Sequence, residues 1–433
     1  MTFIRVSAIV FLSLLAVAGC DKKQDQQQGE NAPAATPSAN DQATAPQPTP
    51  DNNQSTQQAT TPAAGNDQSS QPQTEPQTQA ATDANAPAPG SGGQLNIYNW
   101  SDYIGEHTVE NFAKMTGIKV RYDVYDGNET LEAKLMAGNT GYDIVVPTGP
   151  YLGRQIKAGI YQKLDKSKLP NFSDLDPQIL AALKPFDPNN EYAAPYFWGT
   201  VGIGINVDKV KKLLPDVPVD SLDLIMKPEN IAKLKECGVT MLDSVSDISQ
   251  VVLNYLGKDP HTDKQEDWDA FKQAMFAVRP NIKYFHSSSY INDLANGEIC
   301  AAIGWSGDIF IAANRATEAK NGVTIEYHIP KEGSLLWVDS MAIPHDAPDV
   351  DNAHKFLNYV MDPHVAADGV NFVNYASPVM SATQYVNKDI TSNPDIYPTD
   401  EVKKKLFADA PVSQDLERIR TRVWTEIKTG ASQ

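Results

Sequence analysis

Three short stretches of the sequence pair a tryptophan with an aspartate, and each pair could bind an organic cation. The pairs are Trp100 with Asp102, Trp305 with Asp308, and Trp337 with Asp339. Aromatic faces attract cations and bury methylene groups, while a carboxylate neutralises an ammonium group. A linear diamine, with an ammonium at each end of an apolar stem, matches that combination. A single such pair is more typical of a packed tryptophan beside a helix cap, so the position of the pairs in the fold matters.

The elements predicted around the first pair form a parallel sheet covered by helices. Segments with a strand pattern alternate with segments of helical spacing: Leu95–Asn99, Val109–Met115, Ile118–Val124, Asn128–Ala137 and Tyr142–Val146. This βαβαβ order predicts an α/β fold. Ligands of such sheets bind outside the carboxyl ends of the strands. Residues 99–103 follow the first strand and residues 147–149 follow the third, so both are candidates for the site.

A second group of elements is predicted to begin near Tyr196, where Gly202 and Gly204 interrupt a strand-like segment. Its expected helices and strands are Pro228–Glu236, Trp268–Val278, Ile299–Gly304, Ile309–Lys320 and Leu335–Ile343. Trp305 and Asp308 follow one of these strands and precede a helix. Trp337 and Asp339 are two residues apart on another strand, so they share one face of the sheet. All three pairs are thus expected where ligands bind.

Length and charge restrict the class of protein. About 340 residues follow Gln94, which is too many for one compact core and predicts two lobes. The formal net charge is −18 at pH 7, and the excess of acidic residues extends beyond the N-terminal segment. Nucleic acid is therefore not an expected partner, since phosphate binding needs a basic face. A cationic ligand fits better, although acidity also serves solubility.

Sequence motifs of common enzymes are incomplete or missing. The chain has no HExxH, paired-cysteine zinc pattern, Walker A loop or GxSxG elbow, and its seven histidines are scattered. The pair Gly202 and Gly204 lacks the rest of a dinucleotide-binding motif. Trp305-Ser306-Gly307 matches only part of a nucleophile elbow, because Asp308 follows. We therefore expect no enzymatic activity, no cofactor and no metal site.

Residues 1–19 are typical of a secretory signal peptide. Arg5 precedes the apolar run Ile9–Val17, which is too short to span a bilayer. The string LAVAGC, which ends at Cys20, resembles the bacterial lipobox and predicts that Cys20 receives a lipid. The alternative is a plain signal peptide with a cysteine at its cleavage site. Asp21 in second position favours retention at the inner membrane, so we expect a protein anchored there by its lipid.

Residues 20–93 are predicted to form a disordered tether behind the lipid. They are rich in Gln, Pro, Ala and Thr and contain no aromatic residue. Such a composition cannot bury enough apolar surface to offset the entropy of ordering. A glycosylated or partner-binding low-complexity segment is the alternative.

The two other cysteines, Cys237 and Cys300, form an even pair in a chain expected in an oxidising compartment. We predict a disulfide, which would stabilise the fold by roughly 4 kcal/mol in a chain-entropy model. Two buried free thiols are the alternative, because the sequence does not give the distance between them.

Long strings of the chain resemble the periplasmic putrescine- and spermidine-binding proteins of polyamine ABC transporters, within the bacterial extracellular solute-binding proteins. The strings are IYNWSDYI at 97–104, KLMAGNTGYDIVVP at 134–147, LNYLGKDP at 253–260, RPNIKYFHSSSYINDLANGEIC at 279–300 and IPKEG at 329–333. The resemblance extends from Leu95 to about Lys428. It implies a periplasmic receptor that captures putrescine or spermidine and delivers it to an ABC permease, and we expect a monomer. A sensor of polyamines or of other cationic metabolites with the same fold is the alternative.

The resemblance also implies the architecture of the globular part. The family has a two-lobed periplasmic-binding-protein fold, the Venus flytrap, in which hinge strands join two α/β lobes and the chain crosses between them. We expect residues 94–195 and 310–363 in the first lobe, and residues 196–309 and 364–433 in the second.

The ligand-binding residues implied by the resemblance come from many parts of the chain. They are Trp100, Ser101, Asp102, Tyr103, Thr148, Asp247, Trp305, Asp308, Trp337, Asp339 and Tyr375. Among these, Asp308 matches the principal carboxylate of the family. Thr148 stands where the family has a serine, and Asp247 stands where it has a glutamate. Cys237 and Cys300 match its disulfide.

Three departures from the family pattern bear on ligand choice. Trp337 replaces the phenylalanine of putrescine-preferring members and is more typical of spermidine binders. Asp409 stands where the putrescine binder has an apolar residue, and an additional acid there would meet the extra amine of spermidine. The alternative is that Asp409 is a solvated residue in the last turn of a helix. Pro150 is a further change near the expected pocket. Overall similarity favours putrescine, with spermidine second.

Overall fold

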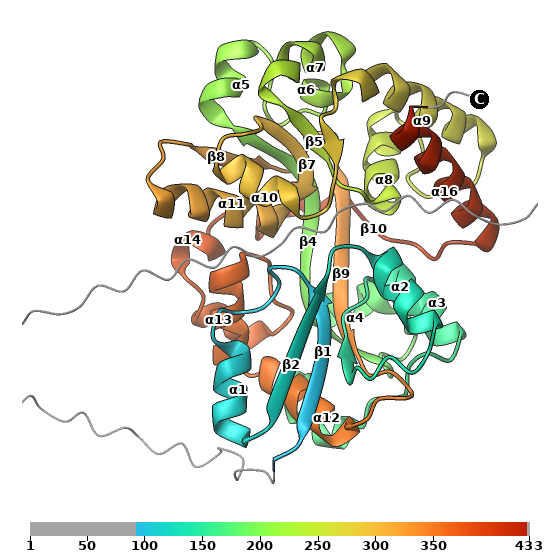
Figure 1. Cartoon of the computed structure of the whole chain (residues 1–433), viewed down its shortest axis with the longest axis vertical. Helices are drawn as coiled ribbons and strands as arrows, with labels where there is room; N and C mark the ends of the chain where they lie inside the picture. The colour runs from blue at the N-terminus through green and yellow to red at the C-terminus, as the bar shows by residue number, and fades with distance from the viewer. Residues whose placement is uncertain (1–91, 431–433) are drawn as a thin grey trace, which may run out of the picture. The chain divides into compact units, whose positions relative to one another are not determined.

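The computed structural model describes residues 92–430, which fold around a mixed ten-stranded sheet (Figure 1). The strand order is β2-β1-β3-β9-β4-β7-β5-β6, while β8 pairs with β4 and β10 pairs with β9. The predicted signal peptide, Cys20 and most of the predicted tether lie outside the described residues. No helix within residues 92–430 has the length and apolar character needed to cross a bilayer.

The first part of the chain has the βαβαβ order that the sequence predicts. Its elements are β1 (Gln94–Trp100), α1 (Thr108–Thr116), β2 (Lys119–Tyr125), α2 (Asn128–Met136), β3 (Ile144–Val145), α3 (Gly149–Lys157), η1 (Lys166–Lys168), η2 (Pro170–Asp174) and α4 (Pro177–Leu183). β1 pairs in parallel with β2 and with β3. Gly117 ends α1 with a φ of 74°, a left-handed conformation that glycine adopts without strain.

The middle of the chain contains five strands and seven α-helices. They are β4 (Ala193–Asn206), α5 (Val207–Leu213), α6 (Asp223–Met226), α7 (Pro228–Leu234), η3 (Lys235–Cys237), β5 (Val239–Met241), α8 (Val245–Tyr255), α9 (Gln265–Val278), η4 (Arg279–Asn281), β6 (Tyr284–Phe285), α10 (Ser289–Ala295), β7 (Ala301–Trp305), α11 (Ser306–Ala319) and β8 (Ile325–His328). β5 is parallel to β6 and to β7.

The last part of the chain contributes to both halves of the sheet. Its elements are β9 (Ser334–Ala342), α12 (Val350–Val360), α13 (Pro363–Val373), η5 (Met380–Gln384), α14 (Lys388–Thr391), α15 (Asp400–Lys403), β10 (Leu406–Ala408) and α16 (Gln414–Thr429). We call the part around β1–β3, with α1–α4, α12 and α13, lobe 1. The part around β5–β8, with α5–α11 and α16, is lobe 2 (Figure 1).

β4 joins the two lobes without a break. Its residues 193–200 pair with β9, and its residues 201–206 pair with β7 and β8. The expected interruption at Gly202 and Gly204 is therefore wrong. Both glycines lie inside the strand. Only glycine fits at these positions, because a side chain at Gly202 would clash with Tyr327 and one at Gly204 would clash with Ile309.

The expected lobe boundaries also differ from the observed course of the chain. We expected residues 310–363 in lobe 1, but α11 and β8 pack on β4, β7 and α10 of lobe 2. We expected residues 364–433 in lobe 2, but α13 packs on α1 and α12 of lobe 1. The chain enters lobe 2 along β4 and leaves it along β9. Helix patterns alone cannot place those crossings, because both strands belong to both lobes.

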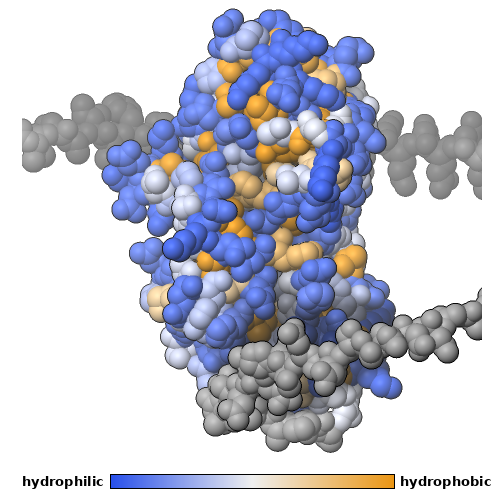
Figure 2. Space-filling model, turned by 90° about the vertical axis from the view of Figure 1, so that its left-hand side faces the viewer, coloured by the Kyte–Doolittle hydropathy of each residue, from blue (hydrophilic) through white to orange (hydrophobic). Residues whose placement is uncertain are grey.

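Apolar side chains fill the space between sheet and helices in each lobe. Leu95 and Ile97 on β1 are fully buried, as are Ile203 on β4 and Ile303 on β7. Hydrophilic side chains cover most of the face drawn in Figure 2, with smaller hydrophobic patches between them. In lobe 2, Cys237 and Cys300 form a disulfide, which confirms that prediction.

Candidate ligand-binding site

A cavity lies between the lobes, beyond the carboxyl ends of β1 and β7 and beside β9. Its volume is about 640 Å³, which includes space open to solvent. All predicted site residues except Asp102 line it: Trp100, Ser101, Tyr103, Thr148, Pro150, Asp247, Trp305, Asp308, Trp337, Asp339, Tyr375 and Asp409. The expectation that the pairs meet at strand ends holds for Trp100 and for Trp305 with Asp308, whereas Trp337 and Asp339 lie inside β9 and Asp102 does not line the cavity.

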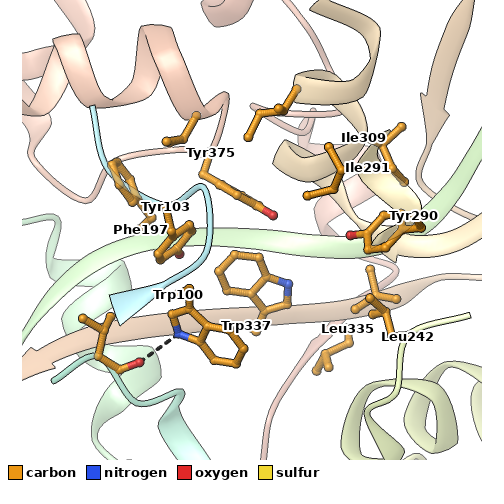
Figure 3. Close-up of a cluster of buried hydrophobic side chains, with 14 of the residues drawn as sticks. Trp100, Tyr103, Phe197, Leu242, Tyr290, Ile291, Ile309, Leu335, Trp337 and Tyr375 are labelled. Carbon is orange, nitrogen blue, oxygen red and sulfur yellow. Dashed lines mark hydrogen bonds between the residues drawn. The ribbon is translucent and has the colours of Figure 1, made fainter. Parts of the chain in front are cut away.

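Aromatic rings from both lobes form the walls, and Figure 3 shows four of them, Trp100, Tyr103, Trp337 and Tyr375. The rings of Trp100 in lobe 1 and Trp305 in lobe 2 are edge to face, with centroids 5.5 Å apart. Tyr375 packs edge to face on Tyr103 at 5.1 Å and on Trp337 at 5.2 Å. Trp100 is fixed by its indole Nε1, which donates to the carbonyl of Val146 at 2.9 Å, the dashed line in Figure 3. Such walls suit the methylene groups and the positive charge of an organic cation.

Asp308 lies in the first turn of α11, where the helix N-terminus favours a negative charge. Two tyrosine hydroxyls donate to its carboxylate, Tyr375 to Oδ1 at 2.7 Å and Tyr290 to Oδ2 at 2.8 Å. Burial raises the pKa of Asp308 to about 7, although these hydrogen bonds favour the charged form. Its oxygens therefore have protein partners before any ligand is bound.

Asp339 lies on β9, where its backbone bridges to that of Thr148 in lobe 1. Its Oδ1 is buried and has no hydrogen-bond partner among residues 92–430, and the hydroxyl of Tyr103 and Nε1 of Trp337 share this condition. Burial raises the pKa of Asp339 to about 7. Buried polar atoms without partners are rare in native proteins, so this part of the cavity is suited to a polar ligand or to water.

Asp247 and Asp409 supply two further carboxylates. Asp247, in the first turn of α8, accepts hydrogen bonds from Ser244 Oγ and, at 3.4 Å, from Trp305 Nε1, and burial raises its pKa to about 6. Asp409 accepts from Gln250 Nε2 at 2.8 Å, and burial raises its pKa to about 7. Asp409 is partly exposed and follows strand β10, so the alternative placement in the last turn of a helix is wrong.

Four carboxylates with raised pKa values around one cavity define its chemistry. Each pKa is raised chiefly because burial penalises the charged form. A bound cation would offset that penalty, whereas a bound anion would increase it. Within the part of the chain that the structure describes, no group of three or more His, Cys, Asp or Glu residues is arranged to hold a metal ion. The arrangement can therefore stabilise an organic cation.

Asp102 does not line the cavity. It has a left-handed backbone, with a φ of 54°, in the turn after β1. Its Oδ1 instead accepts a hydrogen bond from Arg315 Nη2 on α11, at 2.7 Å, which makes an ion pair between the lobes. The turn carries Asp102 away from Ser101 and Tyr103, which do line the cavity, so adjacency in sequence was a poor guide to its place.

Several residues of the site were missed in the sequence. The cavity is also lined by Tyr125, Asp126, Asn128, Tyr151, Ser246, Ser287, Ser288 and Ile291. Tyr290 does not line it but donates a hydrogen bond to Asp308. Most of these lining residues follow strands β2 and β6 or begin helices, so the rule that ligands lie at strand ends could have found them. Tyr290, the second residue of α10, lies at such a position too, but its side chain does not line the cavity, so this rule would not have given its role.

Two α/β lobes joined by continuous strands, with an enclosed cavity between them, define the class of two-lobed solute-binding proteins. Residues 107–399 match the family model described as bacterial extracellular solute-binding protein, and the chain belongs to that family. The family and its solved structures confirm the expected two-lobed fold.

Known relatives cover the whole globular part. The putrescine-binding periplasmic protein PotF of Escherichia coli (strain K12) is 53% identical over 338 residues, which are 78% of this chain and 91% of PotF. The putrescine-binding periplasmic protein SpuD of Pseudomonas aeruginosa (strain UCBPP-PA14) is 52% identical over 337 residues, 78% of this chain and 92% of SpuD. A solved structure described as a spermidine/putrescine ABC transporter from Listeria monocytogenes superimposes with a TM-score of 0.69 at 32% identity, covering 78% of this chain and 99% of that chain.

Proposed function

We propose that this protein is the receptor of an ABC importer and that its ligand is a polyamine, with putrescine preferred. The names of its relatives support this proposal, since PotF and SpuD are both described as putrescine-binding periplasmic proteins. The periplasm is accordingly the proposed location and the importer's permease the proposed partner.

One observation carries the proposal: the cavity holds buried carboxylates from lobe 2 and from the connecting strand β9, between aromatic walls. Asp308 belongs to lobe 2, while Asp339 lies beside Thr148 of lobe 1. A diamine with one ammonium near each carboxylate would link the lobes, and its methylene stem would lie against Trp100, Trp305 and Trp337. In this proposal, all the predicted residues that line the cavity contribute to binding.

The same charges explain why closure would depend on the ligand. In an open form, hydrated carboxylates would attract dications. Closure of the empty cavity buries Asp247, Asp308 and Asp339 without a countercharge, which is costly. A bound diamine removes that cost, so its higher affinity for the closed form shifts the equilibrium between the forms. The importer would then recognise the closed receptor.

The N-terminal region is proposed to keep this receptor at the membrane. A lipid on Cys20 would anchor the mature chain at the inner membrane, and residues 21–93 would serve as the tether. Several acyl chains are needed for firm anchoring, as in bacterial lipoproteins. A monomer suffices for this role, because both lobes of the site come from one chain.

Spermidine is the second candidate, and Asp409 is the observation that favours it. Asp409 lines the cavity, and its carboxylate accepts a hydrogen bond from Gln250. A third ammonium would find a carboxylate there. Trp337, in place of a smaller ring, points in the same direction.

Calorimetric titration tests the proposal. The full chain, purified in detergent, is unfolded and refolded to remove bound ligand, then titrated with putrescine, spermidine, agmatine and arginine. Binding of putrescine or spermidine with a dissociation constant near micromolar, about −8 kcal/mol, is the expected result, with arginine inert. The stronger of the two identifies the preferred ligand. No binding of any of the four would contradict the proposed function.

A further inference from the structure

Tyr290 lies behind the cavity and holds one of its carboxylates in place. It is on α10, its side chain is 1% exposed, and it does not line the cavity itself. Its hydroxyl donates to Asp308 Oδ2 at 2.8 Å and accepts from the backbone N–H of Trp305 at 3.2 Å. Figure 3 shows the hydroxyl directed toward the side of the cluster that holds Tyr375. Tyr290 thus connects two residues of the site without contact to the cavity.

The second oxygen of Asp308 is held from the opposite lobe. Tyr375 follows α13 of lobe 1, and its hydroxyl donates to Asp308 Oδ1 at 2.7 Å and accepts from the Asp308 N–H at 3.1 Å. Tyr290 belongs to lobe 2, as Asp308 does. When the lobes separate, the contact with Tyr375 must be lost, while the contact with Tyr290 lies within one lobe. Tyr290 is thus the partner that an open form would retain.

The backbone around Asp308 leaves room for the Tyr290 ring. A Cβ at Gly304 would lie 2.6 Å from Cε2 of Tyr290, closer than real carbon atoms approach. A Cβ at Gly307 would clash in the same way with the ring of Tyr375. Two glycines in the segment Gly304–Asp308 therefore allow two tyrosines to reach one carboxylate. Such close packing fixes the rotamer of a supporting residue.

We propose that Tyr290 is a positioning residue for cation binding: its hydroxyl orients the Asp308 carboxylate in lobe 2 before the lobes close. This inference rests on the proposed function. A hydroxyl donor favours the charged carboxylate over the neutral acid. It also fixes the direction of the remaining lone pairs, which then face the incoming ammonium. Tyr290 itself makes no contact with the ligand.

The variant Tyr290→Phe tests this role, because it removes one oxygen and keeps the ring. Putrescine is titrated into the full chain, wild type and variant, from pH 5.5 to 8.5. We expect binding about tenfold weaker at pH 7, in line with the loss of a hydrogen bond to a charged group. The control is Tyr255→Phe, which removes a hydroxyl that donates to Asp223 at 2.8 Å in the same lobe, away from the cavity. Its affinity should equal that of wild type.

The pH profile separates positioning from a structural effect. Without the Tyr290 hydroxyl the pKa of Asp308 rises further, so the pH below which binding weakens moves upward. The other charged or titratable groups that act on Asp308 are Tyr103, Tyr375, Asp102 and Arg315, and all are unchanged in the variant. The loss of affinity should accordingly be larger at pH 6 than at pH 8.5. Melting temperature is measured in parallel for both variants.

Each outcome has a definite meaning. An affinity and a pH profile identical to wild type for Tyr290→Phe would overturn the inference. A lower melting temperature with an unshifted pH profile would also overturn it, since Tyr290 would then only support the fold. If the wild-type chain itself binds no polyamine, the proposed function fails, and that result is distinct from a failure of Tyr290.

Discussion

Asp308 and Asp339 face the same cavity, the first from lobe 2 and the second from the connecting strand β9, but their surroundings differ. Asp308 lies at a helix N-terminus and accepts hydrogen bonds from two tyrosines. Asp339 lies within a strand, and its Oδ1 has no hydrogen-bond partner among residues 92–430. The protein therefore stabilises the charge of Asp308 with two tyrosine hydrogen bonds, whereas Asp339, with the hydroxyls of Thr148 and Tyr103 nearby, keeps one buried oxygen for the ligand. Although the family resemblance gives Asp308 the principal role, this geometry indicates that Asp339 gains more when a cation binds.

Replacing each of these two aspartates by asparagine, its neutral isostere, should reduce putrescine affinity more than any other substitution discussed below. Asp339→Asn should weaken putrescine binding at least about 100-fold, the order expected when one partner of a buried pair is removed. The loss of putrescine affinity in Asp308→Asn should be about tenfold smaller, because two tyrosines and the helix N-terminus already stabilise the Asp308 charge. Calorimetric titration of each variant measures the difference. The control is Asp395→Asn, which changes a half-buried carboxylate outside the cavity. Equal losses of putrescine affinity in the two variants would show that Asp308 and Asp339 contribute equally to binding.

The pH dependence should have opposite signs for binding and for stability of the empty protein. In the folded chain the pKa of Asp308, Asp339 and Asp409 is about 7 and that of Asp247 about 6, against an ordinary value of 3.8. An acid whose pKa is raised by folding stabilises the fold fully below its unfolded pKa, and this contribution is lost as pH rises through the folded pKa.

These signs lead to a paired measurement. As pH rises from about 4 to about 7, the contribution of these acids to the free energy of unfolding of the ligand-free chain should decrease. Putrescine affinity should increase over pH 5 to 8, because the ligand needs ionised carboxylates. Thermal unfolding with and without putrescine measures both, and the stabilisation by putrescine should grow with pH. An affinity independent of pH over this range would show that the carboxylates stay ionised without ligand.

Asp102 should show the smallest effect, since it acts between the lobes rather than on the ligand. Its ion pair with Arg315 is partly exposed on both sides, with side-chain exposures of 38% and 34%. Exposed pairs contribute roughly 0.2 to 1 kcal/mol, so Asp102→Asn should weaken binding by no more than about fivefold. Asp415→Asn breaks the exposed pair with Arg418 inside α16 and serves as the control. A loss as large as that of Asp339→Asn would instead place Asp102 among the ligand contacts.

Much of this arrangement could be predicted from local sequence patterns. Helical spacing and strand alternation gave β1, α1, β2, α2 and β9 to within a few residues, since a buried face leaves a period in the sequence. The rule for parallel sheets brought Trp100, Trp305 and Thr148 to one edge. Trp337 and Asp339 were placed on one face by strand alternation alone.

Other features depend on long-range contacts that no local pattern records. β4 continues through Gly202 and Gly204, where the side chains of Tyr327 and Ile309 leave no room for a Cβ atom. Asp102 turns toward Arg315, a residue of the opposite lobe that is distant in sequence. Tyr290 reaches Asp308 from a helix whose face is set only by the packing of α10 on α11. Pairings between lobes therefore need the three-dimensional structure.

We propose that two carboxylates, Asp308 in lobe 2 and Asp339 on the connecting strand β9, recognise the two ammonium groups of one ligand. The most direct test compares putrescine with 1-aminobutane, which has the same four-carbon stem but a single ammonium, in calorimetric titrations of the ligand-stripped chain at pH 7.5. We predict that 1-aminobutane binds at least about 100-fold more weakly, because it leaves one buried carboxylate without a countercharge. Comparable affinities would show that a single ammonium carries recognition, and would contradict this account.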